Sequence, residues 1–434
     1  MHPFVSRAFQ PPVFARRGAA LAVVLAVAAA CTAVDAPVPA VGADAAATDT
    51  AASDGAAATD GLAVDAADAT AADVAQADAG DADAVQPSGY AIGVLELTTA
   101  GAAGRTLPTT VWYPALAGSE GEPVKYLSGF VKSPQGARLG ALPAKGSFPL
   151  VAFSHGNQGV RDQSFFLVEA LVQAGYVVVA PDHVDNTFAD FKQHLVGVMT
   201  LWRPQDLKAA IDRVLKPEAN DPKWLADIID ESKMAVAGHS FGGYTALAVA
   251  GAQLDPPDGT LPDCKKAPAG DPMCTTLAKL GPPPWDFGDP RVDLVLPLAH
   301  ALTAGFSKKS LKAMPVPVML HAAQGDTTTT VAQEAKPAYA AIGGPRSLVV
   351  LQGGSHFSFA NMCELIAFLP KELKSLCEPG AVPSLAESHA AVIHFALAAC
   401  DVYLRGMDAR RTVFKPGKST VYPVEVFSDG VLKP

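Results

Sequence analysis

The feature that most constrains the fold is an alternation of short apolar runs with segments of helical spacing, which begins at about residue 88. Short apolar runs separated by helices predict a mainly parallel sheet covered on both faces. The predicted strands are "YAIGVLELTT", "RTLPTTVWYPA", "FPLVAFSHG", "YVVVAPD", "MAVAGHS", "VDLVLPLA", "VPVMLHAA" and "SLVVLQGG". The predicted helices include "QSFFLVEALVQAGY", "PQDLKAAIDRVLK", "PKWLADIIDES", "GGYTALAVAGAQ" and "SHAAVIHFALAACDVYLRG". We therefore expect an α/β fold over residues 88–434.

The segment before this alternation has the composition of an export signal. Three arginines precede the uncharged apolar run "GAALAVVLAVAAA", which is too short to span a bilayer comfortably. Cys31 follows this run directly, where a bacterial lipoprotein signal places the cysteine that is acylated. We expect residues 1–30 to direct export to the cell envelope of a bacterium. Lipidation of Cys31 and plain cleavage with secretion both remain open.

Residues 31–87 are expected to form a disordered tether. The segment is made almost entirely of Ala, Asp, Thr, Val and Gly, with eleven Asp and no Lys, Arg or aromatic residue. Such a composition cannot bury enough apolar surface to offset the entropy of ordering. Most of the net charge of −10 belongs to this tether, so the remaining chain is near neutral. The sequence contains no basic patch of the kind that predicts nucleic-acid binding.

Ser240 lies in "GHSFGG", between a predicted strand and a predicted helix. The surrounding glycines allow a sharp turn that projects the serine hydroxyl above the sheet. A serine hydroxyl needs a base, and the base needs an acid that orients it. Asp326 follows the seventh predicted strand and His356 follows the eighth, where ligands bind in open α/β sheets. The order Ser, Asp, His is the one expected for a nucleophile elbow.

Backbone N–H groups are expected to stabilise the oxyanion that attack by Ser240 would create. The N–H of Phe241 begins the following helix, where the helix macrodipole adds to the effect. The N–H of Asn157, in "SHGNQG", is the second expected donor. His155 is expected to support this loop by hydrogen bonding.

An insertion at about residues 253–290 precedes the sixth predicted strand. It is either a roof over the site or a surface loop, and Trp285 and Phe287 are the expected substrate contacts if it is a roof. His300, after the sixth strand, is a further possible contact. Cys264 with Cys274 and Cys363 with Cys377 are plausible local disulfides in an exported chain, which leaves Cys400 buried and free. The cysteines lack zinc-site spacing, and no metal is expected.

The motifs "VWYPA", "FSHGNQG", "GHSFGG" and "GGSHFSFA" resemble the α/β-hydrolase superfamily, specifically its dienelactone-hydrolase-like branch with bacterial polyester hydrolases and platelet-activating-factor acetylhydrolases. The resemblance covers about residues 111–360. It supports Asn157 and Phe241 as the oxyanion pair and Asp326 as the acid. The acetylhydrolases carry their acid one strand earlier, where Asp293 is the fallback. Serine in place of the cysteine of dienelactone hydrolases argues against that particular activity.

These observations predict a serine esterase that acts on a small or lipid-like ester, without a cofactor. A lipid anchor on Cys31 would add the membrane as a partner. Two alternatives remain open at this stage. One is a serine peptidase on the same fold, and the other is a surface lipoprotein that keeps the fold as a non-catalytic binding module.

Overall fold

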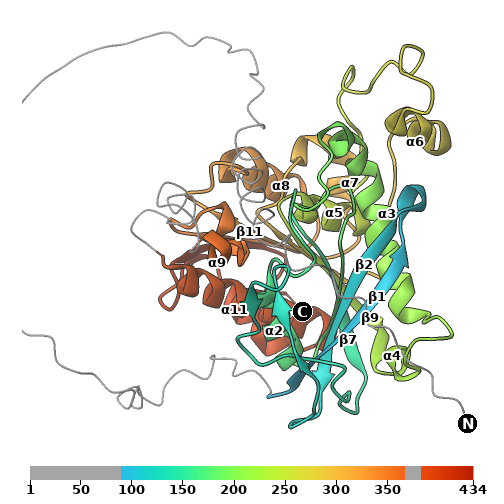
Figure 1. Cartoon of the computed structure of the whole chain (residues 1–434). Coiled ribbons are helices and arrows are strands. Elements are labelled where there is room, and N and C mark those ends of the chain that lie inside the picture. The colour runs from blue at the N-terminus through green and yellow to red at the C-terminus, as the bar shows by residue number, and fades with distance from the viewer. Residues whose placement is uncertain (1–88, 367–382, 434) are drawn as a thin grey trace, which may run out of the picture. The chain divides into compact units, whose positions relative to one another are not determined.

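The computed structural model describes residues 89–366 and 383–433 (Figure 1). The expected signal (1–30), Cys31 and the tether (31–87) lie outside the described residues. Cys377 lies outside them as well.

A twelve-stranded mixed sheet forms the centre of the structure, in the order β13-β14-β12-β11-β10-β9-β7-β8-β2-β1-β6-β3. The six strands from β12 to β8 in this order are parallel, and β2 and β14 pair antiparallel at either side of them. The strands are β1 (Ala91–Ala100), β2 (Thr106–Ala115), β3 (Glu122–Pro123), β6 (Arg138–Leu139), β7 (Phe148–Ser154), β8 (Val177–Pro181), β9 (Ile229–His239), β10 (Leu294–Leu298), β11 (Val318–Ala323), β12 (Arg346–Leu351), β13 (Gly417–Lys418) and β14 (Val424–Asp429). A separate pair is formed by β4 (Lys125–Tyr126) and β5 (Val131–Lys132).

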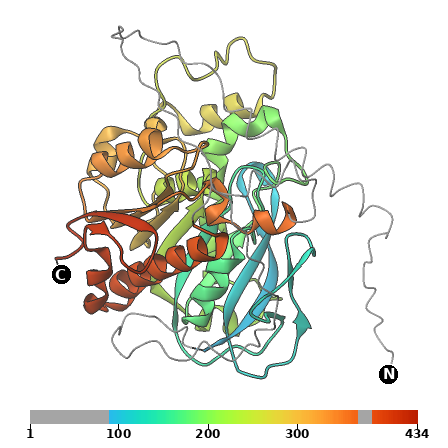
Figure 2. The same ribbon diagram turned by 90° about the vertical axis from the view of Figure 1, so that its left-hand side faces the viewer.

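The predicted α/β class is confirmed, because helices cover the parallel strands on both faces. Helices α3, α5, α7 and α8 share one apolar cluster with alternate residues of the strands, such as Leu150 and Ala152. Helices α2 and α11 pack together, and α11 crosses β9 to β12 (Figure 2, red helix). The helices are α2 (Phe165–Gln173), α3 (Val196–Leu215), α4 (Trp224–Asp227), α5 (Phe241–Val249), α6 (Pro272–Leu280), α7 (Lys308–Lys312), α8 (Lys336–Ala341), α9 (Met362–Ile366) and α11 (Leu385–Arg405).

Helix α11 is the one described helix that is long and apolar enough to cross a membrane by length and composition. Most of its apolar residues are buried inside the fold, including Phe395 and Leu397, each 1–2 % exposed. Its hydropathy is therefore that of a core helix. Cys400 lies on this helix as a buried free thiol, as the sequence predicted.

Two predicted helices differ from the structure. The helix expected to begin at Pro204 begins at Val196 and contains Pro204 in its interior, because packing against the sheet and α5 outweighs the cost of the missing N–H. The helix expected in "PKWLADIIDES" was wrong over its second half. Only Trp224–Asp227 is helical, and β9 begins at Ile229, which pairs with Phe148 of β7.

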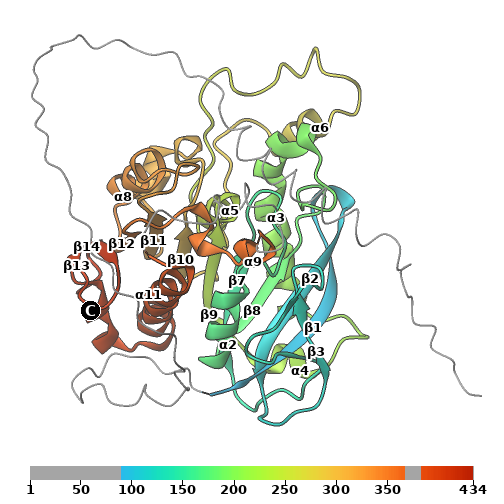
Figure 3. The same ribbon diagram turned by 60° about the vertical axis from the view of Figure 1, so that its left-hand side comes forward.

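The insertion packs its helix α6 on α3 (Figure 3). The indole Nε1 of Trp202 on α3 donates to the hydroxyl of Thr276 at 2.9 Å. Within the insertion, Cys264 and Cys274 form a disulfide with an S–S distance of 2.08 Å. The other expected disulfide involves Cys377, which is outside the described residues.

Candidate active site

Ser240 occupies a sharp turn between β9 and α5. Its φ of 57° and ψ of −120° are unusual for a residue with a side chain, and such strain concentrates at functional sites. Two neighbouring glycines permit the turn through close packing. A Cβ on Gly242 would lie 1.9 Å from the carbonyl oxygen of Ser154, and one on Gly238 would lie 2.3 Å from the carbonyl oxygen of Gly242. Ser240 therefore has the backbone of a nucleophile elbow.

His356 and Asp326 meet at the same edge of the sheet, after β12 and β11. His356 Nδ1 lies 2.8 Å from Asp326 Oδ2, and both side chains are buried. The other carboxylate oxygen, Oδ1, accepts the backbone N–H groups of Thr328 (2.7 Å) and Thr329 (2.9 Å). Asp326 is thus fixed by its own turn and presents one oxygen to the imidazole. This is the arrangement in which an acid orients a base.

The electrostatics keep Asp326 ionised. Burial on its own raises the pKa of this carboxyl, but the opposing charge of His356 and hydrogen bonds from His356 and Thr329 lower it further than burial raises it. The net result is a pKa below the ordinary value. A carboxylate in this state accepts a hydrogen bond from Nδ1–H of His356, and the proton stays on the imidazole.

His239, directly before Ser240, connects the elbow to the base. Its Nε2 lies 2.9 Å from the carbonyl oxygen of His356, and the two imidazole rings are 4.7 Å apart. On its other side, Nδ1 of His239 lies 2.9 Å from Nε2 of Gln163. Since an amide NH₂ donates, His239 accepts at Nδ1 and donates from Nε2. Burial, followed by the charge of His356, lowers the pKa of His239 to about 3, which keeps the ring neutral.

The loop between β7 and α2, residues 155–163 (the β7–α2 loop), lies beside the nucleophile. A Cβ on Gly156 would be 3.4 Å from Cβ of Ser240. The carbonyl oxygen of Gly156 accepts from His155 Nδ1 (2.7 Å) and from the N–H of Gly159 (3.1 Å). His155 thus supports the loop by hydrogen bonding, as expected. Among the described residues, the backbone N–H groups of Asn157 and Phe241 donate to no other residue.

Three other sequence-predicted residues are not brought to the triad by any hydrogen bond or ring contact among the described residues. Trp285 and Phe287 are 5 % and 6 % exposed and belong to the apolar cluster beneath α5. His300 packs its Cβ against Gly243 and places Nε2 2.9 Å from the hydroxyl of Thr303. The fallback acid, Asp293, directly precedes β10 at the amino end of that strand and accepts the backbone N–H of Met234. It therefore lies at the edge of the sheet opposite Ser240.

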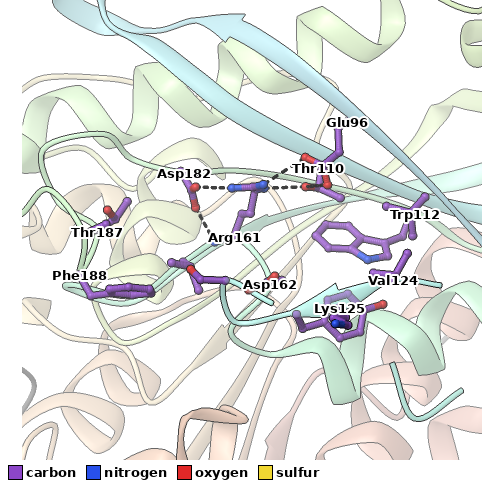
Figure 4. A pocket seen from close by; sticks show the side chains of 15 residues that line it. Glu96, Thr110, Trp112, Val124, Lys125, Arg161, Asp162, Asp182, Thr187 and Phe188 are labelled. Atoms are coloured by element: carbon purple, nitrogen blue, oxygen red, sulfur yellow. Dashed lines mark hydrogen bonds and ion pairs between the residues drawn. The ribbon is translucent and has the colours of Figure 1, made fainter. Parts of the chain in front are cut away.

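A cavity of about 170 Å³ adjoins the far end of the β7–α2 loop (Figure 4). The triad does not line it. Arg161 crosses its wall and binds Asp182 through both its backbone N–H (2.7 Å) and its guanidinium, and Thr110 through Nε (2.6 Å). Burial, partly opposed by the charge of Arg161, raises the pKa of Asp162 to about 7. The hydrogen bond to Thr110 and the ion pair with Asp182 anchor the loop to β2 and to the end of β8.

The chain is similar in sequence and in structure to known proteins. Residues 123–257 match the model of the chlorophyllase family. Cutinase est2 from Thermobifida alba is 27 % identical over 214 residues, which are 49 % of this chain and 54 % of the cutinase. The match thus spans about half of the cutinase's length. A solved ferulic acid esterase from Streptomyces cinnamoneus superposes with a TM-score of 0.54 at 22 % identity, over 79 % of this chain and 97 % of that one.

The chain has the α/β-hydrolase fold. Its similarity to a cutinase and to a ferulic acid esterase is a similarity to esterases. The family-model match includes the elbow and the β7–α2 loop of this chain, whereas Asp326 and His356 lie beyond it. The predicted resemblance is confirmed at this level.

Sequence reasoning missed three residues that contact the predicted site: Gln163, Thr329 and Arg203. Thr329 places its hydroxyl 2.8 Å from Asp326 Oδ2 and 3.2 Å from His356 Nδ1, and the run "GDTTTT" was the available signal. Gln163 and Arg203 had no such signal. Their partners lie far away in the sequence, and each reads locally as a polar residue of a helix or loop.

Proposed function

We propose that this chain is an α/β-hydrolase that works as an exported serine esterase and cleaves carboxylic esters through an acyl-enzyme. The observation that carries the proposal is the contact of His356 Nδ1 with Asp326 Oδ2 beside the strained elbow of Ser240. Similarity to a cutinase and a ferulic acid esterase supports an ester as the substrate class. Binding alone requires neither a strained serine nor an oriented imidazole.

In the first half of the reaction, the Ser240 oxygen attacks the ester carbonyl carbon. His356 takes the serine proton at Nε2, because Nδ1 is held by Asp326. The N–H groups of Asn157 and Phe241 stabilise the negative charge that develops on the carbonyl oxygen. Collapse of this intermediate breaks the carbon–oxygen bond to the alcohol, which leaves with the proton from His356.

In the second half, His356 removes a proton from water, and the resulting hydroxide attacks the acyl carbon. The intermediate collapses with return of the proton to Ser240 and release of the carboxylic acid. Asp326 stays ionised throughout and stabilises the imidazolium of His356. No step requires a group beyond these side chains, the two amides and water.

Hydrolysis of p-nitrophenyl butyrate by the full chain and by Ser240→Ala tests the proposal. The wild-type protein is expected to turn over the ester and to react with a fluorophosphonate probe, and Ser240→Ala to do neither. Asp326→Asn should fold and lose about 10³–10⁴-fold in kcat, because the amide no longer accepts the Nδ1 proton. Unchanged turnover in Ser240→Ala would refute the mechanism. A wild-type protein that ignores both esters and probe would favour a binding module.

We also propose that the chain is held at the cell envelope through Cys31. Support comes from the sequence alone, since Cys31 follows an apolar run of export type. Metabolic labelling with an alkyne fatty acid in a bacterial host should mark the wild-type chain and not Cys31→Ser. Label on both would place the lipid elsewhere, and label on neither would favour secretion.

A further inference from the structure

Arg203 is a fully buried arginine on α3 whose guanidinium faces the β7–α2 loop. It is 0 % exposed. Its Nη2 donates to the backbone carbonyl oxygen of His155, and its Nη1 lies 3.5 Å from that of Gly156. The same Nη1 donates to Asn186 Oδ1 at 2.6 Å. These acceptors are neutral oxygens, so the guanidinium is used here for its fixed fork of donors.

The same guanidinium also contacts the other side of the predicted oxyanion site. Its central carbon lies 4.5 Å from the ring centre of Phe241, in the position of a cation–π contact. Phe241 is the first residue of α5, and its backbone N–H is the other proposed oxyanion donor beside that of Asn157. Arg203 therefore touches both segments that present an oxyanion donor.

The contacts with the loop act on the peptide group that joins Gly156 to Asn157. A peptide group is planar, so the direction of its C=O sets the direction of its N–H. The carbonyl oxygen of Gly156 accepts hydrogen bonds from His155 Nδ1 and from the N–H of Gly159. Nη1 of Arg203 lies 3.5 Å from the same oxygen. Asn186 extends the contact, because its Nδ2 donates to Asn157 Oδ1 at 2.8 Å. Both the peptide plane and the side chain of Asn157 are thereby fixed.

The charge of Arg203 is sustained in this buried position. Burial lowers the pKa of Arg203 to about 9, with Asp206 raising it and Arg105 lowering it. The guanidinium is therefore protonated at neutral pH. Asp206 binds Arg105 at 2.7 Å and His183 Nδ1 at 3.0 Å, and His183 Nε2 in turn lies 2.9 Å from the Ser154 hydroxyl. This network surrounds Arg203 with fixed polar groups.

We infer that Arg203 is a positioning residue that aligns the N–H groups of Asn157 and Phe241 on the oxyanion. The inference rests on the proposed esterase function. Arg203 touches no substrate; it acts through the Gly156–Asn157 peptide, through Asn186 and through the Phe241 ring. Donors aimed at the oxyanion stabilise the transition state more than the bound ester. Loss of alignment must therefore lower kcat rather than raise KM.

The experiment compares wild type, Arg203→Lys, Arg203→Met and Asn186→Ala on p-nitrophenyl butyrate. Rates are divided by the number of active sites, counted by complete titration with a fluorophosphonate. Loss of a whole oxyanion donor costs about 10²–10³-fold in kcat, so misalignment is expected to cost about 10- to 100-fold. Arg203→Lys keeps the charge without the planar fork and is expected to fall in this range, with KM within threefold of wild type.

A second readout separates alignment from general damage to the fold. A trifluoromethyl ketone adds to the serine and forms an oxyanion, so its inhibition constant should rise in the same proportion as kcat/KM falls. Arg213→Lys is the matched control, because Arg213 is a buried arginine on the same helix that binds Asp221 and the carbonyl of Thr98. It should leave both constants within twofold of wild type.

The outcomes are distinct. Should Arg203→Met fail to fold, Arg203→Lys and Asn186→Ala carry the test. Wild-type kcat per active site and wild-type inhibition in these two variants would overturn the inference and leave the proposed function intact. An equal loss in Arg213→Lys would also overturn it, since any change on α3 would then have the same effect. A wild-type protein with no ester hydrolysis would overturn both the proposed function and the inference.

Discussion

Nε2 of His239 lies 2.9 Å from the backbone carbonyl oxygen of His356, so the residue before the proposed nucleophile holds the main chain of the proposed base. This hydrogen bond fixes the distance between the elbow of Ser240 and His356, in addition to the pairing of the strands that carry them. Gln163 determines the tautomer of His239 that makes this bond, because its amide donates to Nδ1. The carbonyl oxygen of the same amide accepts the N–H of Gly156 at 3.1 Å. One buried side chain therefore supports the elbow and the β7–α2 loop together.

Gln163→Leu should lower both stability and activity. The change leaves Nδ1 of His239 and the N–H of Gly156 without partners, and each buried unsatisfied group costs about 1–3 kcal/mol. With two such groups, the free energy of unfolding in urea should fall by about 2–6 kcal/mol. The value of kcat on p-nitrophenyl butyrate should fall about tenfold or more. Gln173→Leu is the control, because Gln173 is the partly exposed last residue of α2 and its amide binds Gln135 rather than the site. Equal stability in the two variants would show that the Gln163 amide contributes no net stabilisation.

Thr329→Val should weaken the base without disturbing the fold. The Thr329 hydroxyl lies 2.8 Å from Asp326 Oδ2 and 2.9 Å from the carbonyl oxygen of Ala299, and valine has the same shape without the hydroxyl. A charge-assisted hydrogen bond contributes about 1.5–3 kcal/mol, and Asp326 keeps its two backbone N–H bonds. We expect kcat to fall about 3- to 30-fold. Thr330→Val, one residue further on, removes a hydroxyl that accepts the N–H of Gln333 and makes no hydrogen bond with Asp326 or His356 among the described residues, so kcat should stay within twofold of wild type. A similar loss of kcat there would assign the effect to the turn.

The fold was predictable where hydrophobic periodicity and length agree. The buried strands from Phe148 to Leu351 are continuous apolar runs with turn residues after them, and all six of them are present in the structure. The segment "WLADIID" was misread because its apolar spacing suits a helix, while the strand beginning at Ile229 is selected by pairing with β7. The antiparallel strand β14, which lies between β12 and the edge strand β13, was missed because its alternation of apolar and polar residues is short.

The candidate site was predictable only as far as strand ends reveal it. Ser240, Asp326 and His356 each follow a strand, so the topology of parallel sheets brings them to one edge. Gln163, Arg203 and Asn186 come from a loop, a helix and another loop. Their hydrogen bonds depend on how α3 and the β7–α2 loop pack against the sheet. Nothing in their local sequence indicates that packing.

The disulfide of the insertion should prove dispensable for turnover of short esters. Its helix α6 is held on α3, and the disulfide between Cys264 and Cys274 closes a loop with a sequence separation of 10 residues. Closing a loop of that size contributes about 2–3 kcal/mol in the chain-entropy account. In a variant with Ser at both positions, trypsin should cut at Lys265 and Lys266 faster than in wild type. The kcat on p-nitrophenyl butyrate should stay within twofold of the wild-type value. A large fall in kcat with the fold intact would instead make the insertion part of the site.

Glu169 should make stability depend on pH between about 5 and 8. It lies on α2, is 1 % exposed, and accepts the hydroxyls of Tyr126 and Ser133 through Oε1. Burial, partly offset by the hydrogen bonds from Ser133 and Tyr126, raises the pKa of Glu169 to about 7. In the unfolded chain the same group has its ordinary pKa, near 4.3.

At a pH between these two pKa values, Glu169 is protonated in the folded protein and ionised in the unfolded chain. The free energy of unfolding must therefore decrease as pH rises from about 4 to about 7, and level off above. From pH 5 to pH 8, Glu169 accounts for a decrease of about 2–3 kcal/mol. Glu169→Gln cannot ionise and keeps an acceptor oxygen for both hydroxyls. Urea unfolding at the two pH values should show a decrease smaller by that amount in Glu169→Gln than in wild type. The exposed Glu231→Gln should match wild type, and a pH dependence unaltered by Glu169→Gln would mean that Glu169 is already ionised at pH 5.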